Sequence, residues 1–178
     1  MAGAPARPHP FRAERYELGA SGLWLSAVSV EESMALGVAL AAIDPWARYG
    51  TTAATLAALF APAADGGIRL AVRSPTTAAP IGVMVIRHPW LVGPYMQFLA
   101  VLPGHQGAGI GHALLGWFEA EARSGNARNL WICAADFNER AHSLYARFGF
   151  EVVVSLDDLI KPGIDEILMR KQLTPSGS

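Results

Sequence analysis

Cysteine and charge are both scarce in this chain of 178 residues, and each shortage excludes a class of protein. Cys133 is the only cysteine, so no disulfide can form within the chain, and the composition favours a reducing compartment. Charged side chains make up only 16% of the residues, and their signs nearly cancel to a net charge of -1. Without a basic excess, we expect neither a nucleic-acid partner nor attraction to a membrane surface.

Long hydrophobic runs and metal-ligand patterns are also missing. The longest uncharged apolar stretch near the start, residues 34–43, is far shorter than the roughly 20 apolar residues that cross a bilayer. Residues 1–14 carry arginine and proline without an apolar segment, so we expect a flexible tail there and a second one at residues 174–178. Histidine and cysteine do not cluster at ligand spacing, so we expect no metal site. These absences together predict a soluble cytoplasmic protein.

Apolar side chains, in contrast, make up 52% of the chain, enough for one well-packed core. We expect a single domain over residues 15–173. Ser29 or Ser33 is expected to cap the first helix, and Thr51 or Thr52 the second. The predicted helices cover residues 30–43, 53–60, 112–122 and 138–148. The predicted strands cover residues 23–28, 68–73, 81–87, 95–101, 130–133, 150–156 and 164–169.

The order of these elements predicts an α+β fold with a mixed, mostly antiparallel central sheet of six to seven strands and about four helices. Strands 68–73 and 81–87 flank a loop of turn formers, so we expect them to pair antiparallel. The strand, helix and strand between residues 95 and 133 have the length of a parallel right-handed crossover. Helices are then expected on the faces of the sheet, in a three-layer arrangement of the α/β kind.

The most informative segment is residues 101–111, which read V-L-P-G-H-Q-G-A-G-I-G. A predicted strand ends at Pro103, four glycines follow within eight residues, and an amphipathic helix then begins. Backbone N–H groups at a helix N-terminus lack intrahelical partners, and the helix dipole favours an anion there. Glycine lets the anion approach these amides closely. The segment therefore predicts a phosphate site.

Two common phosphate ligands fit this loop poorly. A nucleoside triphosphate loop needs Lys and then Ser or Thr after its last glycine, whereas Ile110 and Gly111 follow Gly109 here. A dinucleotide loop needs the spacing G-x-G-x-x-G and an acidic residue at the end of the next strand. The spacing here is G-x-G-x-G, and only Asp136 keeps the dinucleotide interpretation open.

A third pattern matches better. Residues 106–111, Q-G-A-G-I-G, resemble the acetyl-coenzyme A motif of the GNAT N-acetyltransferase superfamily, with F-L-A-V-L-P before it at residues 98–103. A second match, N-E-R-A-H-S-L-Y-A-R-F-G-F-E at residues 138–151, resembles the second cofactor motif of that family. The resemblance extends to I-L-M-R-K-Q-L at residues 167–173 and covers roughly residues 23–173.

The resemblance implies the acyl-CoA N-acyltransferase fold, with acetyl-coenzyme A as cosubstrate. The expected reaction is direct transfer of acetyl to a primary amine of a small molecule, peptide or protein, in a ternary complex. A longer acyl donor is one alternative, and a non-catalytic module that binds acyl-coenzyme A is another. An edge strand could also pair with a second subunit, so a homodimer is possible.

The resemblance also assigns the cofactor site. Loop N–H groups would hold the pyrophosphate, and the strand before the loop would pair with the pantetheine arm. No lysine or arginine lies between residues 101 and 122, so we expect neutral amides to supply most of the grip. The cofactor-binding residues that the resemblance implies are Leu99, Ala100, Val101, Gln106, Gly107, Ala108, Gly109, Ile110, Gly111, Asn138 and Tyr145.

Two catalytic roles and one structural or cofactor-binding role follow in the same way. Tyr145 matches the family's general acid, which protonates the departing thiolate, although it also falls in an apolar helix stripe that suits packing. The N–H of Leu99 or Val101 would polarise the thioester carbonyl. Asn138 could contact the cofactor, cap the helix or do both.

The general base is not apparent, because residues 95–101 contain no carboxylate. His88, which follows the preceding strand, is our candidate, and Asp44, Tyr49 and Tyr95 are further ones. The remaining residues of interest have ordinary interpretations: His105 and His112 on the surface, Cys133 packed in a strand, and Trp24, Trp46 and Trp90 either in the core or around an acceptor pocket.

Overall fold

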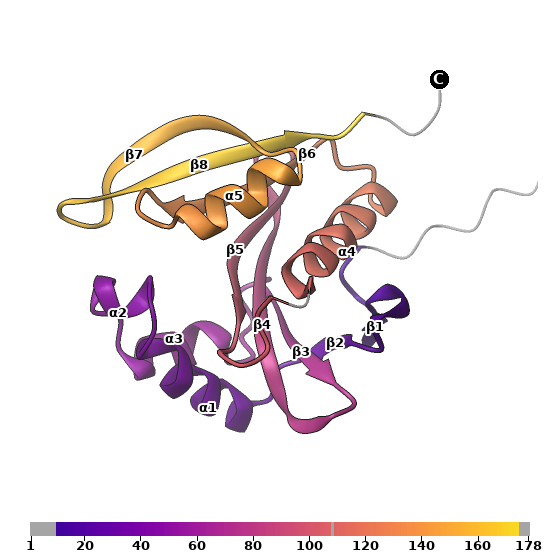
Figure 1. Cartoon of the computed structure of the whole chain (residues 1–178). Coiled ribbons are helices and arrows are strands. Elements are labelled where there is room, and N and C mark those ends of the chain that lie inside the picture. Colours follow the sequence, from indigo (N-terminus) through magenta and orange to yellow (C-terminus); the bar gives the residue numbers. More distant parts are fainter. Residues whose placement is uncertain (1–9, 108, 175–178) are drawn as a thin grey trace, which may run out of the picture.

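A computed structural model gives the fold and describes residues 10–107 and 109–174 (Figure 1). One mixed sheet carries its strands in the order β1-β2-β3-β4-β5-β6-β8-β7. Neighbouring strands pair antiparallel except β5 and β6, which are parallel. The strands are β1 (Arg15–Glu17), β2 (Trp24–Ala27), β3 (Ile68–Ser74), β4 (Thr77–Trp90), β5 (Gly93–Val101), β6 (Asn129–Ala135), β7 (Glu151–Lys161) and β8 (Ile164–Gln172).

The helices are α1 (Val30–Ala41), α2 (Trp46–Tyr49), α3 (Ala53–Phe60), α4 (Ile110–Ser124) and α5 (Glu139–Arg147), and a short 3-10 helix (η1) covers Gly19–Ser21. Ser29 is the residue that caps α1. Its hydroxyl accepts from the Glu32 N–H at 3.1 Å, and the Glu32 carboxylate accepts from the Ser29 N–H at 2.9 Å. Thr52 caps α3 through the N–H of Thr55 at 3.1 Å.

The helices cover the two faces of the sheet, and each face has its own apolar core (Figure 1). Helices α1 and α3 pack on one face, and α4 and α5 on the other. The first core is built by Leu36, Leu40, Leu56 and Phe60 against Val83, Val85, Phe98 and Ala100. The second is built by Leu114, Leu115, Phe118 and Tyr145 against Met84, Ile86, Met96, Leu130 and Ile132.

The α+β class and the parallel crossover agree with the sequence prediction, but the count of elements was too low. The sheet has one additional short strand, β1, while β4 extends at both ends beyond the predicted residues 81–87. The segment expected to be a short connection forms α2. Phe11, expected in the N-terminal tail, is only 5% exposed and packs on Trp117 and Phe118. The core therefore extends ahead of residue 15.

The sheet opens between β5 and β6. These strands pair only at Tyr95 with Trp131 and at Met96 with Ile132. Beyond that point residues 98–101 pair only with β4, and residues 133–135 only with β8. The inner edges of both strands are therefore left for another partner.

Strand β7 forms one edge of the sheet, and nearly all of its residues are exposed. Its apolar side chains Val152, Val153 and Val154 are 65%, 48% and 43% exposed. A second subunit at this edge stays a prediction. Within the described part of the chain, no helix is long and apolar enough to cross a membrane.

Gly116 offers a test of α4 that leaves every other contact alone. It is exposed, and an added Cβ would meet no atom within 4 Å. Because alanine favours the helix, we expect Gly116→Ala to stabilise the protein by about 1 kcal/mol. Urea denaturation of the two proteins measures the difference, and a lower free energy of unfolding in the variant would contradict it.

Candidate active site

A cavity of about 600 Å³ lies beside the end of β5 that does not pair with β6, next to the glycine loop and α5. Residues 43–46, just before and at the start of α2, form one wall, and α5 forms the other. Every described residue of the predicted cofactor site lines it, while Ala108 lies outside the described residues. The lining includes Leu99, Ala100, Val101, Gln106, Gly107, Gly109, Ile110, Gly111, Asn138 and Tyr145.

The glycine loop turns its backbone into the cavity. Gly104, Gly107 and Gly109 all have positive φ, at 86°, 91° and 74°, a region that side chains other than glycine disfavour. The first intrahelical bond of α4 runs from the Ala113 N–H to the Gly109 carbonyl at 3.0 Å. The N–H groups ahead of residue 113 therefore have no helical acceptor and can bind an anion.

Strand β5 presents backbone groups to the same cavity. The Leu102 N–H donates to the Ile81 carbonyl at 2.8 Å, so this residue points toward β4. Because successive residues of a strand point in opposite directions, Leu99 and Val101 point toward the opening. Gln106 confirms this direction, since its side-chain amide donates to the Val101 carbonyl at 2.7 Å. The N–H groups of Leu99 and Val101 are thereby aimed at the cavity.

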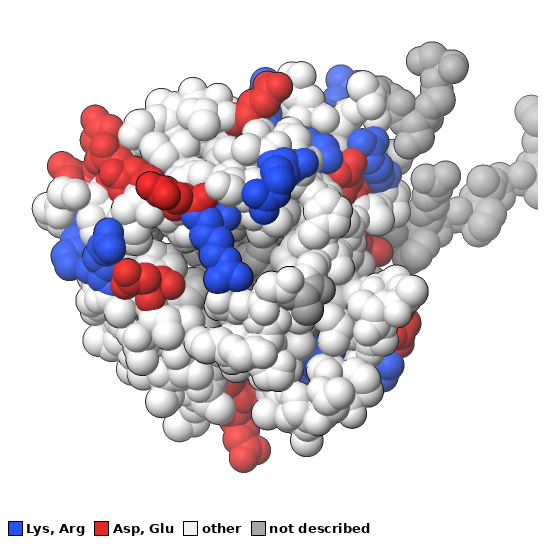
Figure 2. Space-filling view, viewed as in Figure 1, with Lys and Arg blue, Asp and Glu red and all other residues white. Residues whose placement is uncertain are grey.

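Gln106 also connects the loop to α5. Its side-chain oxygen accepts from Arg140 at 2.5 Å, while its nitrogen holds Val101. Arg140 and Arg147 both line the cavity, and Figure 2 shows basic side chains beside the central hollow. The expectation that neutral amides supply most of the anion binding did not include these two cations of α5, which lie more than thirty residues beyond the loop in the chain.

Tyr145 reaches the cavity from α5, although its side chain is only 6% exposed. Burial raises the pKa of Tyr145 above its ordinary value, and the nearby Cys133 acts in the same direction. The hydroxyl therefore keeps its proton at neutral pH and can donate it. Asn138 lines the cavity and also caps α5, because its side-chain oxygen accepts from the Ala141 N–H at 3.2 Å.

His88, the predicted general base, does not lie at the cavity. His88 packs beside Phe11, with ring centroids 5.7 Å apart, and is not among the residues that line the cavity. Of the other candidates, Asp44 lines the cavity, Tyr95 stacks on Trp90 at 4.6 Å, and Tyr49 bonds to a carboxylate described below.

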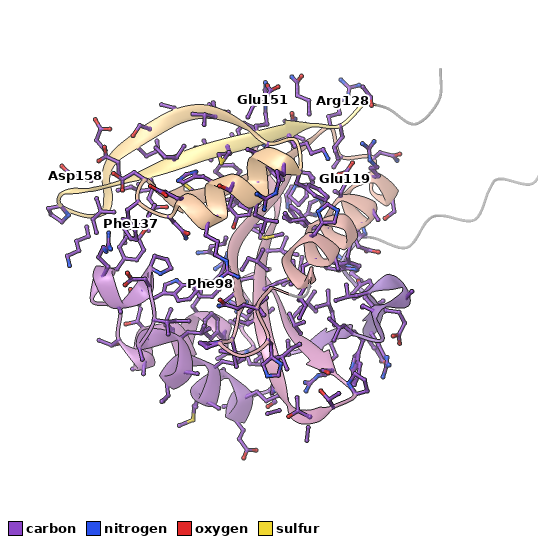
Figure 3. The ribbon with its side chains drawn as sticks, viewed as in Figure 1. Phe98, Glu119, Arg128, Phe137, Glu151 and Asp158 are labelled. Carbon is purple, nitrogen blue, oxygen red and sulfur yellow. The ribbon has the colours of Figure 1, made fainter. Side chains whose placement is uncertain are left out.

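The expected aromatic lining is reduced to one tryptophan. Trp46 lines the cavity and stacks on Phe98 at 4.6 Å, and Figure 3 shows Phe98 on the side of β5 that faces α3. Trp24 lies under Arg15, and Trp90 packs against Trp131. His112, expected on the surface, is exposed but lines the cavity.

One carboxylate in this region was not singled out from the sequence. Glu166 of β8 is 4% exposed and accepts a hydrogen bond from the hydroxyl of Tyr49. The signal was a pair of acidic residues, Asp165 and Glu166, between the apolar residues Ile164 and Ile167 of a strand. Adjacent residues of a strand face opposite sides, and the sequence alone does not say which one is buried.

Cys133 behaves as expected for a packed thiol. Burial raises its pKa to about 12, with Glu166 adding to the effect. The protonated thiol is a poor nucleophile at neutral pH. Among the described residues, no three His, Cys, Asp or Glu side chains are grouped to hold a metal ion.

A glycine-rich loop at a helix N-terminus, beside an opened strand edge, is an arrangement that would hold a coenzyme with a pyrophosphate and an extended arm. Known proteins that bind such a coenzyme resemble this chain. Residues 42–150, well over half of the chain, match the Acetyltransferase (GNAT) family. The chain belongs to this family. No curated protein matches the sequence.

Solved structures share the fold at low sequence identity. The ribosomal-protein-S18-alanine N-acetyltransferase of Escherichia coli is 18% identical, with a TM-score of 0.67 over 88% of this chain and 97% of its own. An aminoglycoside 6'-N-acetyltransferase complexed with coenzyme A is 16% identical, with a TM-score of 0.66 over 86% and 99%. A GNAT acetyltransferase of Elizabethkingia anophelis with acetyl-CoA bound is 21% identical, with a TM-score of 0.54 over 61% and 77%.

Proposed function

We propose that this acetyltransferase moves acetyl from acetyl-coenzyme A directly to a primary amine, with both substrates bound at once. The observation that carries the proposal is a single cavity that unites the glycine loop, the open edge of β5 and the hydroxyl-bearing Tyr145. Coenzyme A needs all three: anion donors for its pyrophosphate, a strand edge for its arm, and a proton donor for its sulfur.

The strand edge suits the thioester end of the cofactor. The pantetheine arm would pair with residues 99–101 as an added strand, which uses backbone groups of any sequence. The N–H of Leu99 or Val101 then donates to the thioester carbonyl. As the amine attacks, negative charge develops on that oxygen, and a fixed donor stabilises it.

Tyr145 completes the reaction as the general acid. Its phenol retains the proton because burial raises its pKa. When the carbon–sulfur bond breaks, this proton passes to the departing sulfur, so that the leaving group is a neutral thiol. Asn138 would fix the start of α5 and with it the position of Tyr145, about two helical turns further along.

The acceptor would enter from the side of residues 43–46 and α2, across the cavity from the loop. Two of the similar structures are named for acting on a ribosomal-protein alanine and on aminoglycosides, both of which offer amines. The near-neutral charge of this chain selects neither class.

A thiol-release assay tests the proposal. Purified protein is incubated with acetyl-coenzyme A and each member of a panel of diamines, an aminoglycoside and peptides with free N-termini. Free thiol should appear with at least one amine and in proportion to acetylated product. Tight acetyl-coenzyme A binding with no thiol release across the panel would instead favour a binding module. Faster release from a longer acyl-coenzyme A would redefine the donor.

Arg147 tests whether the basic side chains of α5 contribute to acetyl-coenzyme A binding. We expect Arg147→Ala to weaken acetyl-coenzyme A binding about five- to tenfold at low salt, because a charged donor to phosphate is lost. Isothermal titration calorimetry measures the affinity, and added salt should shrink the difference. Arg128→Ala is the matched control, since Arg128 is exposed at the far end of the molecule in Figure 3. Equal losses in both variants would contradict a specific contact.

A further inference from the structure

Glu166 is a buried carboxylate that the reaction described above does not use. It pairs in register with Ala135 across β8 and β6, so both side chains lie on the same face of the sheet. Its neighbour Asp165 faces the other way and accepts from the N–H of Asp158 in β7 at 3.2 Å. A carboxylate that is 4% exposed is rarely kept without a partner.

Two side chains hold Glu166. The hydroxyl of Tyr49, at the end of α2, donates to one carboxylate oxygen, and the thiol of Cys133 is hydrogen-bonded to the carboxylate. Tyr49 also packs beside Phe137, with ring centroids 6.1 Å apart. Figure 3 shows Phe137 between α2 and the β7–β8 hairpin. Glu166 is thus enclosed by β6, β8 and α2.

Helix α2 is the element that connects this carboxylate to the cavity. Residues 43–46 line the cavity, and Tyr49 follows within one helical turn of Trp46. A bond from Lys161 to the Arg48 carbonyl at 2.8 Å fixes the same turn to the hairpin. Neither Tyr49 nor Glu166 is among the residues that line the cavity, but Tyr49 is only partly buried. An acceptor amine would reach its hydroxyl by extending past residues 43–46 along α2, while Glu166 stays enclosed.

Cys133 places Glu166 at the opening of the sheet. It is the first residue of β6 beyond the last pair with β5, Ile132 with Met96. Its thiol contacts Glu166, while its neighbour Ile132 faces the other side of the sheet and shares a core with Tyr145. Glu166 and Tyr145 therefore approach the same opening from opposite faces.

We propose that Tyr49 and Glu166 form a proton relay that deprotonates the ammonium group of the acceptor. The inference rests on the acetyl transfer proposed above and supplies its missing base. The ammonium N–H bond breaks and its proton goes to the Tyr49 oxygen, while the Tyr49 proton moves to the Glu166 carboxylate. Tyr49 is neutral before and after, and Glu166 carries the proton until it is released to solvent.

The remaining steps balance without another reactant. The freed amine forms the carbon–nitrogen bond, and the carbonyl electron pair moves to oxygen under the strand N–H. The carbon–sulfur bond then breaks, and sulfur takes the proton of Tyr145. The phenolate of Tyr145 recovers a proton from the new amide nitrogen.

The protonation state of Glu166 sets the expected pH dependence. Burial raises the pKa of Glu166 above its ordinary value, and the hydrogen bond from Tyr49 opposes that rise. The carboxylate is the active form, so the rate should fall as pH drops through this raised pKa. The titratable groups that face Glu166 are Tyr49 of α2, Cys133 of β6, Asp136 after β6, His142 of α5 and Tyr95 of β5.

The first experiment compares Glu166→Gln with the unaltered protein, using the amine that gives the fastest thiol release. We expect kcat/KM to fall about 10²-fold, the usual share of a general base, and the acidic limb of its pH profile to disappear. Acetyl-coenzyme A affinity should not change. Because the amide avoids the burial of a charge, thermal unfolding at neutral pH should not occur earlier in the variant.

The second experiment tests the relay. Tyr49→Phe should cause a loss of similar size, and the double variant should be no slower than the slower single variant, because both changes interrupt one path. Tyr49→Phe also covers the case in which Glu166→Gln fails to fold. Glu151→Gln, an exposed carboxylate on β7, is the control and should retain the full rate and the acidic limb.

The outcomes separate this inference from the proposed function. Thiol release with an unchanged rate and acidic limb in Glu166→Gln would overturn the relay and leave the acetyltransferase standing. Losses that multiply in the double variant would show two independent roles and overturn it as well. No thiol release by the unaltered protein with any amine would remove the proposed function, and the relay with it.

Discussion

Replacing Tyr145 by Phe is expected to lower kcat about 10²-fold, while acetyl-coenzyme A binds as before. The substitution removes one oxygen and keeps the ring that packs between α5 and the sheet. Without the phenol, the thiolate must leave unprotonated, and the transition state loses its acid. Stopped-time thiol-release assays give kcat, and calorimetric titration gives the cofactor affinity.

Tyr16→Phe is the control for Tyr145→Phe. Tyr16 packs on Trp117 at 5.0 Å, and its hydroxyl accepts from the Ala13 N–H, far from the cavity. Its loss should leave turnover intact. Turnover of Tyr145→Phe at the rate of the unaltered protein would refute the acid role and leave Tyr145 as a packing residue.

Replacing Gly109 by Val is expected to weaken acetyl-coenzyme A binding at least tenfold. Gly109 has φ 74° and ψ 4° at the N-cap of α4, where a β-branched residue is strained by about 1–3 kcal/mol. The loop can relieve that strain only by turning its amides away from the anion. Calorimetric titration with acetyl-coenzyme A measures the loss.

Gly116→Val separates the loop from the helix that follows it. Both substitutions put valine at a glycine of the same segment, but Gly116 does not have a positive φ and has open space around it. We expect this variant to bind the cofactor normally. Similar affinities for the two variants would show that the conformation of residue 109 does not shape the anion site.

The parts of the fold that the sequence predicted well are those with strong local signals. The predicted helix at residues 53–60 has the bounds of α3, because a threonine cap starts it and Pro62 follows it. The strand, glycine loop and helix around residue 106 were likewise predicted. Strand β1 has three residues and α2 has one turn, and both depend on tertiary contacts that no local pattern records.

The site was predicted where its residues are contiguous and missed where they converge from distant segments. The glycine loop is a single stretch, so its backbone role could be inferred. Arg140 and Arg147 join the cavity only because α5 packs beside the loop. Glu166 reaches the opening because β8 pairs with β6, a neighbour that the order of strands in the chain does not reveal. Glu166 lies outside residues 95–101, where the resemblance led us to look for the carboxylate of a general base.

The direction of the Leu99 and Val101 amides follows from their position in β5, whatever side chains they carry. A substitution in this strand therefore keeps the amide directions, as long as the new side chain fits against β4 and the core. Inserting or deleting one residue between Phe98 and Val101 is different, because it turns every later amide from the cavity to β4. Proteins with this site therefore need to keep the number of residues in this part of β5. Two of them can direct the same amides into the cavity while having few identical residues.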